Sequence, residues 1–175
     1  YSIVLIDSLG NVCSISDRCY IKRPPEGGVS GYVIIGNGTV TDYYTPASMY
    51  YRYSWARMLY LSNEFDILEN GGLITKLAWY YDNATGINYT NQTCYFKAVD
   101  NTALVTGYID PVTDGATQVW AGTLTIVQGW VEITLTTPFY LPPGKHLQVY
   151  WHHNHGAYLG STYYWRHTST SPVYR

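Results

Sequence analysis

Charged residues are scarce in this sequence. Only 13% of its 175 residues are charged, with 10 Lys and Arg against 12 Asp and Glu, whereas soluble globular proteins usually carry about 25%. A net charge of −2 without a basic block offers no electrostatic attraction to a nucleic-acid backbone or to an anionic membrane surface. We therefore expect no nucleic acid among the partners of this protein.

Long apolar runs are also missing. No stretch reaches the roughly 18 apolar residues that a spanning helix needs, so we expect no membrane insertion. The sequence begins at Tyr1, with neither a charged n-region nor an initiator Met, and we expect it to be a processed form. A composition of 46% hydrophobic residues with 20 tyrosines predicts one folded domain with a polar, tyrosine-rich surface, which is common in extracellular proteins.

Motifs of enzymes and of metal sites are absent as well. The sequence contains no GxSxG, HExxH, P-loop or dinucleotide-binding motif. Glu132 lies in a predicted strand without a second carboxylate, and we expect it to face solvent near a Lys or Arg. Alternation points His153 and His155 the same way and His152 the opposite way, so at most two of these imidazoles converge, fewer than the three ligands of a tight metal site. We expect no catalysis, no cofactor and no metal; the clustered imidazoles would instead bond to backbone or water.

Cysteines are few and odd in number. Cys13 and Cys19 bracket a short segment and are the natural disulfide pair in an oxidising compartment. Cys94 would then be a buried free thiol in a strand. The sequence has no CxxC spacing, which argues against a zinc or redox site.

What the chain does have is alternation with a period of two, rich in Val, Ile, Thr, Tyr and Trp and broken by Gly, Pro, Asn and Asp. The predicted strands are Tyr32–Ile35, Arg52–Leu61, Ile74–Tyr81, Gln92–Val99, Ala103–Ile109, Gln118–Ile126, Gly129–Leu135 and His146–His152. We expect a tight hairpin turn at Asp100–Asn101, turns at Asp114–Gly115 and Pro142–Gly144, and one short helix from Ser62 to Leu68. The pattern predicts an all-β protein: a two-sheet antiparallel sandwich, a jelly roll or a related fold.

The N-terminus departs from the alternation. Apart from Ser2, residues 1–6 are apolar at consecutive positions, and a Pro-Pro and Gly-Gly hinge follows within residues 22–28. We divide the chain into an extension, residues 1–30, and a sandwich domain, residues 31–175. The extension either supplies a first strand to its own sandwich or inserts into the sheet of a neighbouring subunit. The inserted residues would be Ile3, Val4, Leu5 and Ile6.

A family resemblance covers residues 31–170. It rests on Ile35–Thr39, Tyr51–Tyr60, Gly72–Tyr80, Gln118–Thr123, Gly129–Leu135, Thr137–Phe139 and His146–Val149. In order and spacing these segments resemble the repeated β-sandwich, jelly-roll-like domain of large secreted and surface adhesin proteins of Bacteroidota. The resemblance implies an extracellular, adhesive or architectural domain that is not itself catalytic. The chain departs from that family in having one sandwich with an N-terminal extension, three cysteines and a histidine-rich segment.

Aromatic residues exceed what one small core can hold. The clusters are Tyr43–Tyr44, Tyr50–Tyr51, Tyr80–Tyr81, Trp151 and Tyr163–Trp165. Some must be exposed, where aromatic rings stack on sugars or fill protein interfaces. A sugar-binding sandwich would gather them in one platform, whereas a fibre subunit would spread them over two or more patches.

Glycosylation motifs are dense. Asn37, Asn83, Asn88 and Asn91 each begin an N-x-T sequon, and Ser8 lies in a short Asp-Ser-apolar pattern that resembles an O-glycosylation motif of Bacteroidota. The alternative is that these asparagines simply occupy polar turns.

From these observations we expect a structural subunit of an extracellular fibre, a homopolymer assembled by N-terminal strand exchange. The alternative is a carbohydrate-binding or adhesion module of a cell-surface protein. For the fibre subunit we expect the partners to be copies of the chain; glycans, covalent or bound, are the further expected partners.

Overall fold

The computed structural model describes residues 20–21, 31–64, 71–84, 86–160 and 163–168. Two short strands come first: β1 (Tyr20–Ile21) pairs antiparallel with β2 (Tyr32–Val33). The predicted donor residues Ile3, Val4, Leu5 and Ile6 lie outside the described residues, as do Ser8, Cys13 and Cys19. Among the described residues, no helix is long and apolar enough to cross a membrane.

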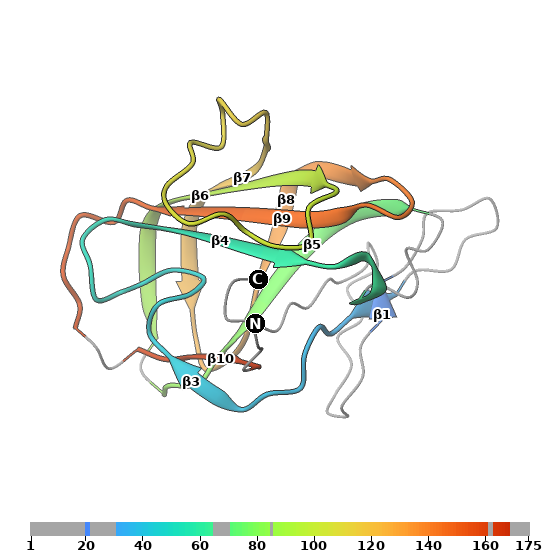
Figure 1. The fold of residues 1–175 in the computed structure, drawn as a ribbon. Helices are drawn as coiled ribbons and strands as arrows, with labels where there is room; N and C mark the ends of the chain where they lie inside the picture. The colour runs from blue at the N-terminus through green and yellow to red at the C-terminus, as the bar shows by residue number, and fades with distance from the viewer. Residues whose placement is uncertain (1–19, 22–30, 65–70, 85, 161–162, 169–175) are drawn as a thin grey trace.

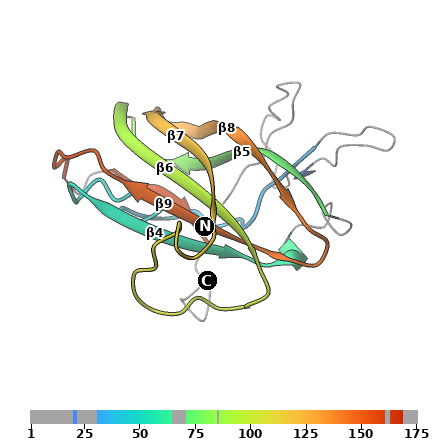
Figure 2. The same cartoon turned by 90° about the horizontal axis from the view of Figure 1, so that it is seen from above.

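The remaining strands form two four-stranded antiparallel sheets (Figure 1). The first sheet has the order β3 (Val40–Asp42), β10 (Trp165–His167), β5 (Gly72–Tyr81) and β8 (Gly129–Leu141). The second has the order β4 (Ser54–Tyr60), β9 (His146–His153), β6 (Ile87–Val99) and β7 (Thr117–Ile126). Figure 2 shows the strands of the second sheet side by side in this order. Two four-stranded sheets with these strand orders make a jelly roll. The alternation in the sequence predicted this fold.

Aromatic side chains fill the space between the sheets. Trp151 of β9 contacts Trp79 of β5 edge-on at 5.0 Å between ring centroids and stacks on Trp120 of β7 at 5.6 Å. On β8 the alternating Val131, Ile133 and Leu135 are buried, whereas Glu132 between them points outward. The period of two in the sequence therefore corresponds to inward and outward faces of real strands.

One predicted strand, Ala103–Ile109, is wrong, and so is the tight hairpin at Asp100–Asn101. Residues 100–116 form a long loop between β6 and β7 that lies over the outer face of the second sheet (Figure 1). The carbonyls of Val105 and Gly107 accept hydrogen bonds from the Arg57 guanidinium instead of pairing with a neighbouring strand. Gly107 has a φ of 98°, which interrupts extended backbone.

The predicted turns and the start of the predicted helix agree more closely with the structure. Ser62–Glu64 forms a 3-10 turn, η1, and the rest of the predicted helix lies outside the described residues. Gly115 and Gly144 take positive φ values of 76° and 72° in the predicted turns. At the second turn the Lys145 amide donates to the Pro142 carbonyl at 3.3 Å.

Candidate functional site

Two connections meet at one end of the sandwich. The β3–β4 loop, residues 43–53, and the β9–β10 loop, whose described part begins at residue 154, lie side by side at the left of Figure 1. The Gly156 amide donates to the Arg52 carbonyl at 2.9 Å, and the Leu159 amide donates to the Met49 carbonyl at 3.3 Å. These bonds join the two loops into one surface.

The middle of the β3–β4 loop is drawn into the core. Ala47 and Met49 are fully buried, and the indole nitrogen of Trp165 donates to the Ala47 carbonyl at 3.3 Å. Because the centre of the loop is held inside, the residues on both sides of it are turned toward the surface. The loop is therefore fixed by packing as well as by its backbone bonds.

A buried polar group, which we call the histidine network, holds the same loop from below. It consists of Tyr89, Gln92, Trp151 and His153. The indole nitrogen of Trp151 donates to Gln92 Oε1 at 2.9 Å, so the amide nitrogen of Gln92 faces His153 Nδ1, also at 2.9 Å. Nδ1 must then accept, and the proton of the neutral ring sits on Nε2.

The Nε2 proton of His153 points to the loop. Nε2 lies 3.0 Å from the Tyr51 carbonyl and 2.9 Å from the Tyr89 hydroxyl, and that hydroxyl donates to the Ser48 carbonyl at 3.0 Å. Burial lowers the pKa of His153 to about 4, and the neighbouring His155 lowers it as well, against the opposing effect of the Tyr51 carbonyl. The neutral ring is thus the form that fits this site at neutral pH.

Tyrosines cover the surface that these contacts support. Five of them are linked by ring contacts and make up what we call the tyrosine platform: Tyr43, Tyr44, Tyr50, Tyr51 and Tyr158. Centroid distances run from 4.3 Å for Tyr43 and Tyr44 to 5.6 Å for Tyr50 and Tyr158. Tyr44, Tyr51 and Tyr158 are 51%, 49% and 58% exposed. The platform therefore presents several aromatic faces to solvent on a backbone that is already ordered.

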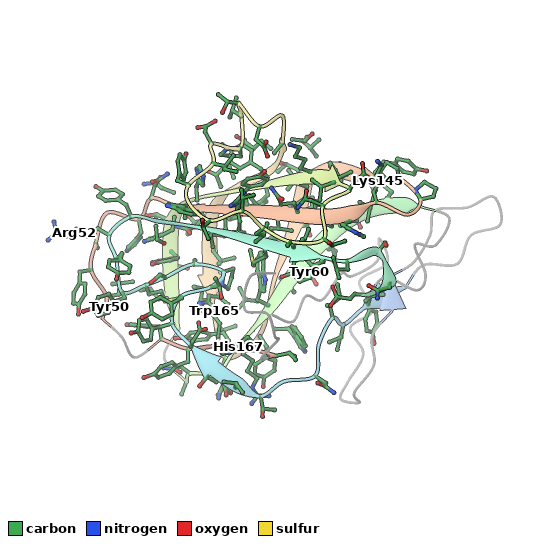
Figure 3. All side chains as sticks on the ribbon, in the orientation of Figure 1. Tyr50, Arg52, Tyr60, Lys145, Trp165 and His167 are labelled. Carbon is green, nitrogen blue, oxygen red and sulfur yellow. The ribbon has the colours of Figure 1, made fainter. Side chains whose placement is uncertain are left out.

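Arg52 and Tyr53 border the platform. Both side chains are exposed, although the carbonyl of Arg52 is bonded to Gly156. Figure 3 shows Tyr50 and Arg52 together at this end of the molecule. A polar cation thus stands next to a group of aromatic rings.

A second, smaller aromatic surface lies on the outer face of the β4–β9–β6–β7 sheet. Exposed Trp55 and Tyr108 meet edge-on at 5.3 Å, and Tyr108 also lies 5.9 Å from His152. Tyr108 belongs to the 100–116 loop, which Arg57 fixes to the sheet through two carbonyls.

The far side of this loop is held by a carboxylate. Asp114 accepts hydrogen bonds from Lys97, at 2.9 Å, and from the Tyr150 hydroxyl. Burial pushes the pKa of Asp114 up, but these two donors outweigh it and lower the pKa below its usual value.

The predicted glycosylation sites fall in different settings. Asn37 is exposed before β3, and Asn83 is half-buried in the β5–β6 connection. Asn88 is exposed on β6, where its side-chain oxygen accepts a bond from Thr125 at 2.9 Å. Asn91 is exposed where the register of β6 and β7 shifts, and its φ of 56° is one that asparagine tolerates better than most residues. The backbone accounts for Asn91 without a glycan; whether any sequon is occupied stays a prediction.

The structure also describes the other single residues for which we made predictions. Cys94 is a buried free thiol, as expected, and burial raises its pKa well above the usual value. His153 and His155 do share one side, with centroids 6.2 Å apart, and His155 Nδ1 lies 3.1 Å from the Thr90 amide. Within the described residues, no three metal-ligating side chains form a cluster. Glu132 pairs with Lys76 at 2.7 Å, as predicted.

Of the aromatic clusters in the sequence, only some reach the surface. Tyr81, Trp151 and Trp165 are core residues with at most 1% exposure. Sequence reasoning did not single out Arg52 or Tyr158. Arg52 has a local signal, its place next to Tyr50–Tyr51, but Tyr158 joins the platform only through the fold.

A comparison of the chain with protein families, curated proteins and solved structures found no match. The resemblance to Bacteroidota adhesin domains therefore stays a prediction, and function must be argued from the site itself.

Proposed function

We propose that this protein is a carbohydrate-binding or adhesion module whose tyrosine platform stacks on sugar rings. The observation that carries the proposal is the grouping of five tyrosines on one pre-ordered surface. Each tyrosine offers an apolar face for the C–H side of a sugar and a hydroxyl for its rim, and loses little rotamer entropy on binding. The same proposal places the protein outside the cell, in line with its sparse charge.

Glycan binding by matched tyrosine variants tests this proposal. Tyr51→Ala and Tyr158→Ala remove exposed rings from the platform, and each should weaken binding to a glycan found on an array by roughly tenfold. Tyr140→Ala is the control, because Tyr140 is equally exposed, at 56%, but lies on β8 beside Gly71, away from the platform. Absence of binding to every glycan, or equal losses in all three variants, would contradict the proposal.

A second candidate is the fibre subunit. The aromatic surface of Trp55 and Tyr108 favours it, because a homopolymer needs complementary patches on more than one face. Val4→Asp and Ile6→Asp should each convert high-mass polymers into monomers if the N-terminal residues insert into a neighbour. Light scattering of the full chain would show this, and polymers that persist in both variants would refute strand exchange.

A further inference from the structure

Arg52 differs from the other described cations in having no polar partner. Every other described lysine or arginine is engaged: Arg57 with two carbonyls, Lys76 with Glu132, Lys97 with Asp114, Lys145 with Asp100 and Arg166 with Asp82. Within the described residues the Arg52 guanidinium has neither a hydrogen bond nor an ion pair. Of the six lysines and arginines that the structure describes, Arg52 alone lacks such a partner there.

The position of Arg52 puts this guanidinium at the tyrosine platform. Its backbone is bonded to Gly156, and the next residue back, Tyr51, has its carbonyl 3.0 Å from the buried His153. The side chain is exposed, it follows the platform residue Tyr51 in the sequence, and it lies at the same end of the molecule as Tyr50 (Figure 3). The guanidinium therefore starts from a fixed point next to a surface suited to a sugar ring.

The acidic residue just before the β3–β4 loop, Asp42, already has other partners. Asp42 accepts a hydrogen bond from the Tyr44 amide at 2.9 Å, and its other oxygen lies 3.6 Å from His167 Nδ1. It is not paired with Arg52, so among the described residues no carboxylate neutralises the positive charge at the platform.

We propose that the platform selects a sugar that carries a negative charge, with Arg52 pairing to the carboxylate or sulfate of the sugar bound on the tyrosines. This inference rests on the proposed carbohydrate-binding function and names its ligand class. A planar guanidinium matches the two oxygens of a carboxylate or sulfate, and a hydrogen bond between charged groups is stronger than a neutral one. The aromatic faces supply affinity for the ring, and Arg52 distinguishes acidic from neutral sugars.

Two pairs of polysaccharides separate charge from sugar. Polygalacturonate and its methyl ester differ by the carboxylate, and dextran sulfate and dextran differ by the sulfate. Binding of the full chain to each is measured by isothermal titration calorimetry at low salt. We expect tight binding to at least one charged member and weak binding to its neutral counterpart.

Arg52→Gln and Lys145→Gln supply the matched variants. Each removes one positive charge, but Lys145 lies at the opposite end of the sandwich, as Figure 3 shows. Arg52→Gln should weaken binding to the charged polysaccharide by roughly tenfold and leave binding to the neutral one unchanged. Lys145→Gln should change neither by more than about twofold.

The outcomes separate the two proposals. Equal binding of charged and neutral members that falls in Tyr51→Ala would overturn the role of Arg52 and keep the carbohydrate-binding function. Charged-sugar binding that Arg52→Gln leaves intact would overturn the role of Arg52 as well. A protein that binds none of the four polysaccharides and no glycan on an array would overturn both.

Discussion

The β3–β4 loop and the 100–116 loop are attached to the sandwich in opposite ways. The β3–β4 loop, which carries most of the tyrosine platform, is held from inside by neutral groups: the histidine network and the indole of Trp165. The 100–116 loop is held from outside by charges, namely Arg57 and the pair of Lys97 with Asp114. One attachment is hidden from water and ions, and the other is partly exposed to them.

The difference shows how one fold supplies loops of unequal firmness. Neutral hydrogen bonds in a buried site are insensitive to salt, and breaking them leaves unsatisfied groups inside. Half-exposed ion pairs are weaker and are screened by salt. A binding surface built on the first loop keeps its shape across ionic conditions, whereas the second loop is free to adapt. The predictions below test this contrast, from the largest effect to the smallest.

His153→Ala should have the largest effect on stability. The change empties a buried site and removes the partner of the Tyr51 carbonyl. It also removes one acceptor of the Gln92 amide nitrogen, which keeps only its bond to the Thr90 carbonyl, so we expect the free energy of unfolding to fall by about 3 kcal/mol. Urea denaturation measures this loss. His152→Ala is the matched control, because the neighbouring ring faces the other loop and is only half-buried. A cost for His152→Ala as large as that for His153→Ala would refute the proposed importance of the network.

Acidification should loosen the two loops in different pH ranges. The pKa of His153 is about 4 in the folded chain against an ordinary 6.5, so the unfolded chain takes up the proton first as pH falls. The stability that the neutral ring provides is therefore complete above pH 6.5 and is lost between pH 6.5 and 4, by about 3 kcal/mol in all. The stability curves of wild type and His153→Ala, measured by urea titration at each pH, should converge near pH 4.

Asp114 also loses its contribution as pH falls, but over a lower pH range. Because its pKa is lowered in the folded chain, its contribution is present above the ordinary value of 3.8 and is lost only as pH falls through the lower folded pKa. Hydrogen exchange near pH 4.5 should therefore show the β3–β4 loop opening before the 100–116 loop. Simultaneous opening would remove the distinction between the two attachments.

Arg57→Ala should cost about 1 kcal/mol, less than His153→Ala, because its bonds are partly exposed to water. The loss should be local, with faster hydrogen exchange and proteolysis within residues 100–116 and no change within residues 43–53. Arg52→Ala is the control, since that arginine has no polar partner among the described residues, and it should leave both loops unaffected.

Lys145→Gln should have the smallest effect. Its bond to Asp100, at the base of the 100–116 loop, joins two exposed groups, and such pairs contribute about 0.5 kcal/mol or less. Thermal unfolding in low salt and in 1 M salt would measure it. A loss above about 1 kcal/mol would show that surface charge anchors this loop more strongly than its exposure suggests.

The fold was predictable because its signal is local. Alternation in segments such as Gly129–Leu135 reports a strand with one buried face, whatever it pairs with. A related signal misled at Ala103–Ile109, which has the valine, threonine, tyrosine and isoleucine typical of a strand. What decides the outcome there is Arg57, which bonds the loop carbonyls from another part of the sequence.

The candidate site was predictable only in part for the same reason. The pairs Tyr43–Tyr44 and Tyr50–Tyr51 stand out in the sequence, and their loop does reach the surface. Tyr158 arrives from the other end of the chain through the β9–β10 connection. No local pattern shows that Arg52 lacks a partner in the described part of the chain, because that follows from where the described carboxylates lie.

The labelling of Cys94 can report how often the folded sandwich opens. Its sulfur lies wholly inside, and its raised pKa keeps it in the unreactive thiol form, so an alkylating reagent can label it only when the sheets part. The labelling rate of the peptide that contains Cys94, followed by mass spectrometry, therefore counts global openings of the sandwich. Loop openings at either surface would leave that count unchanged.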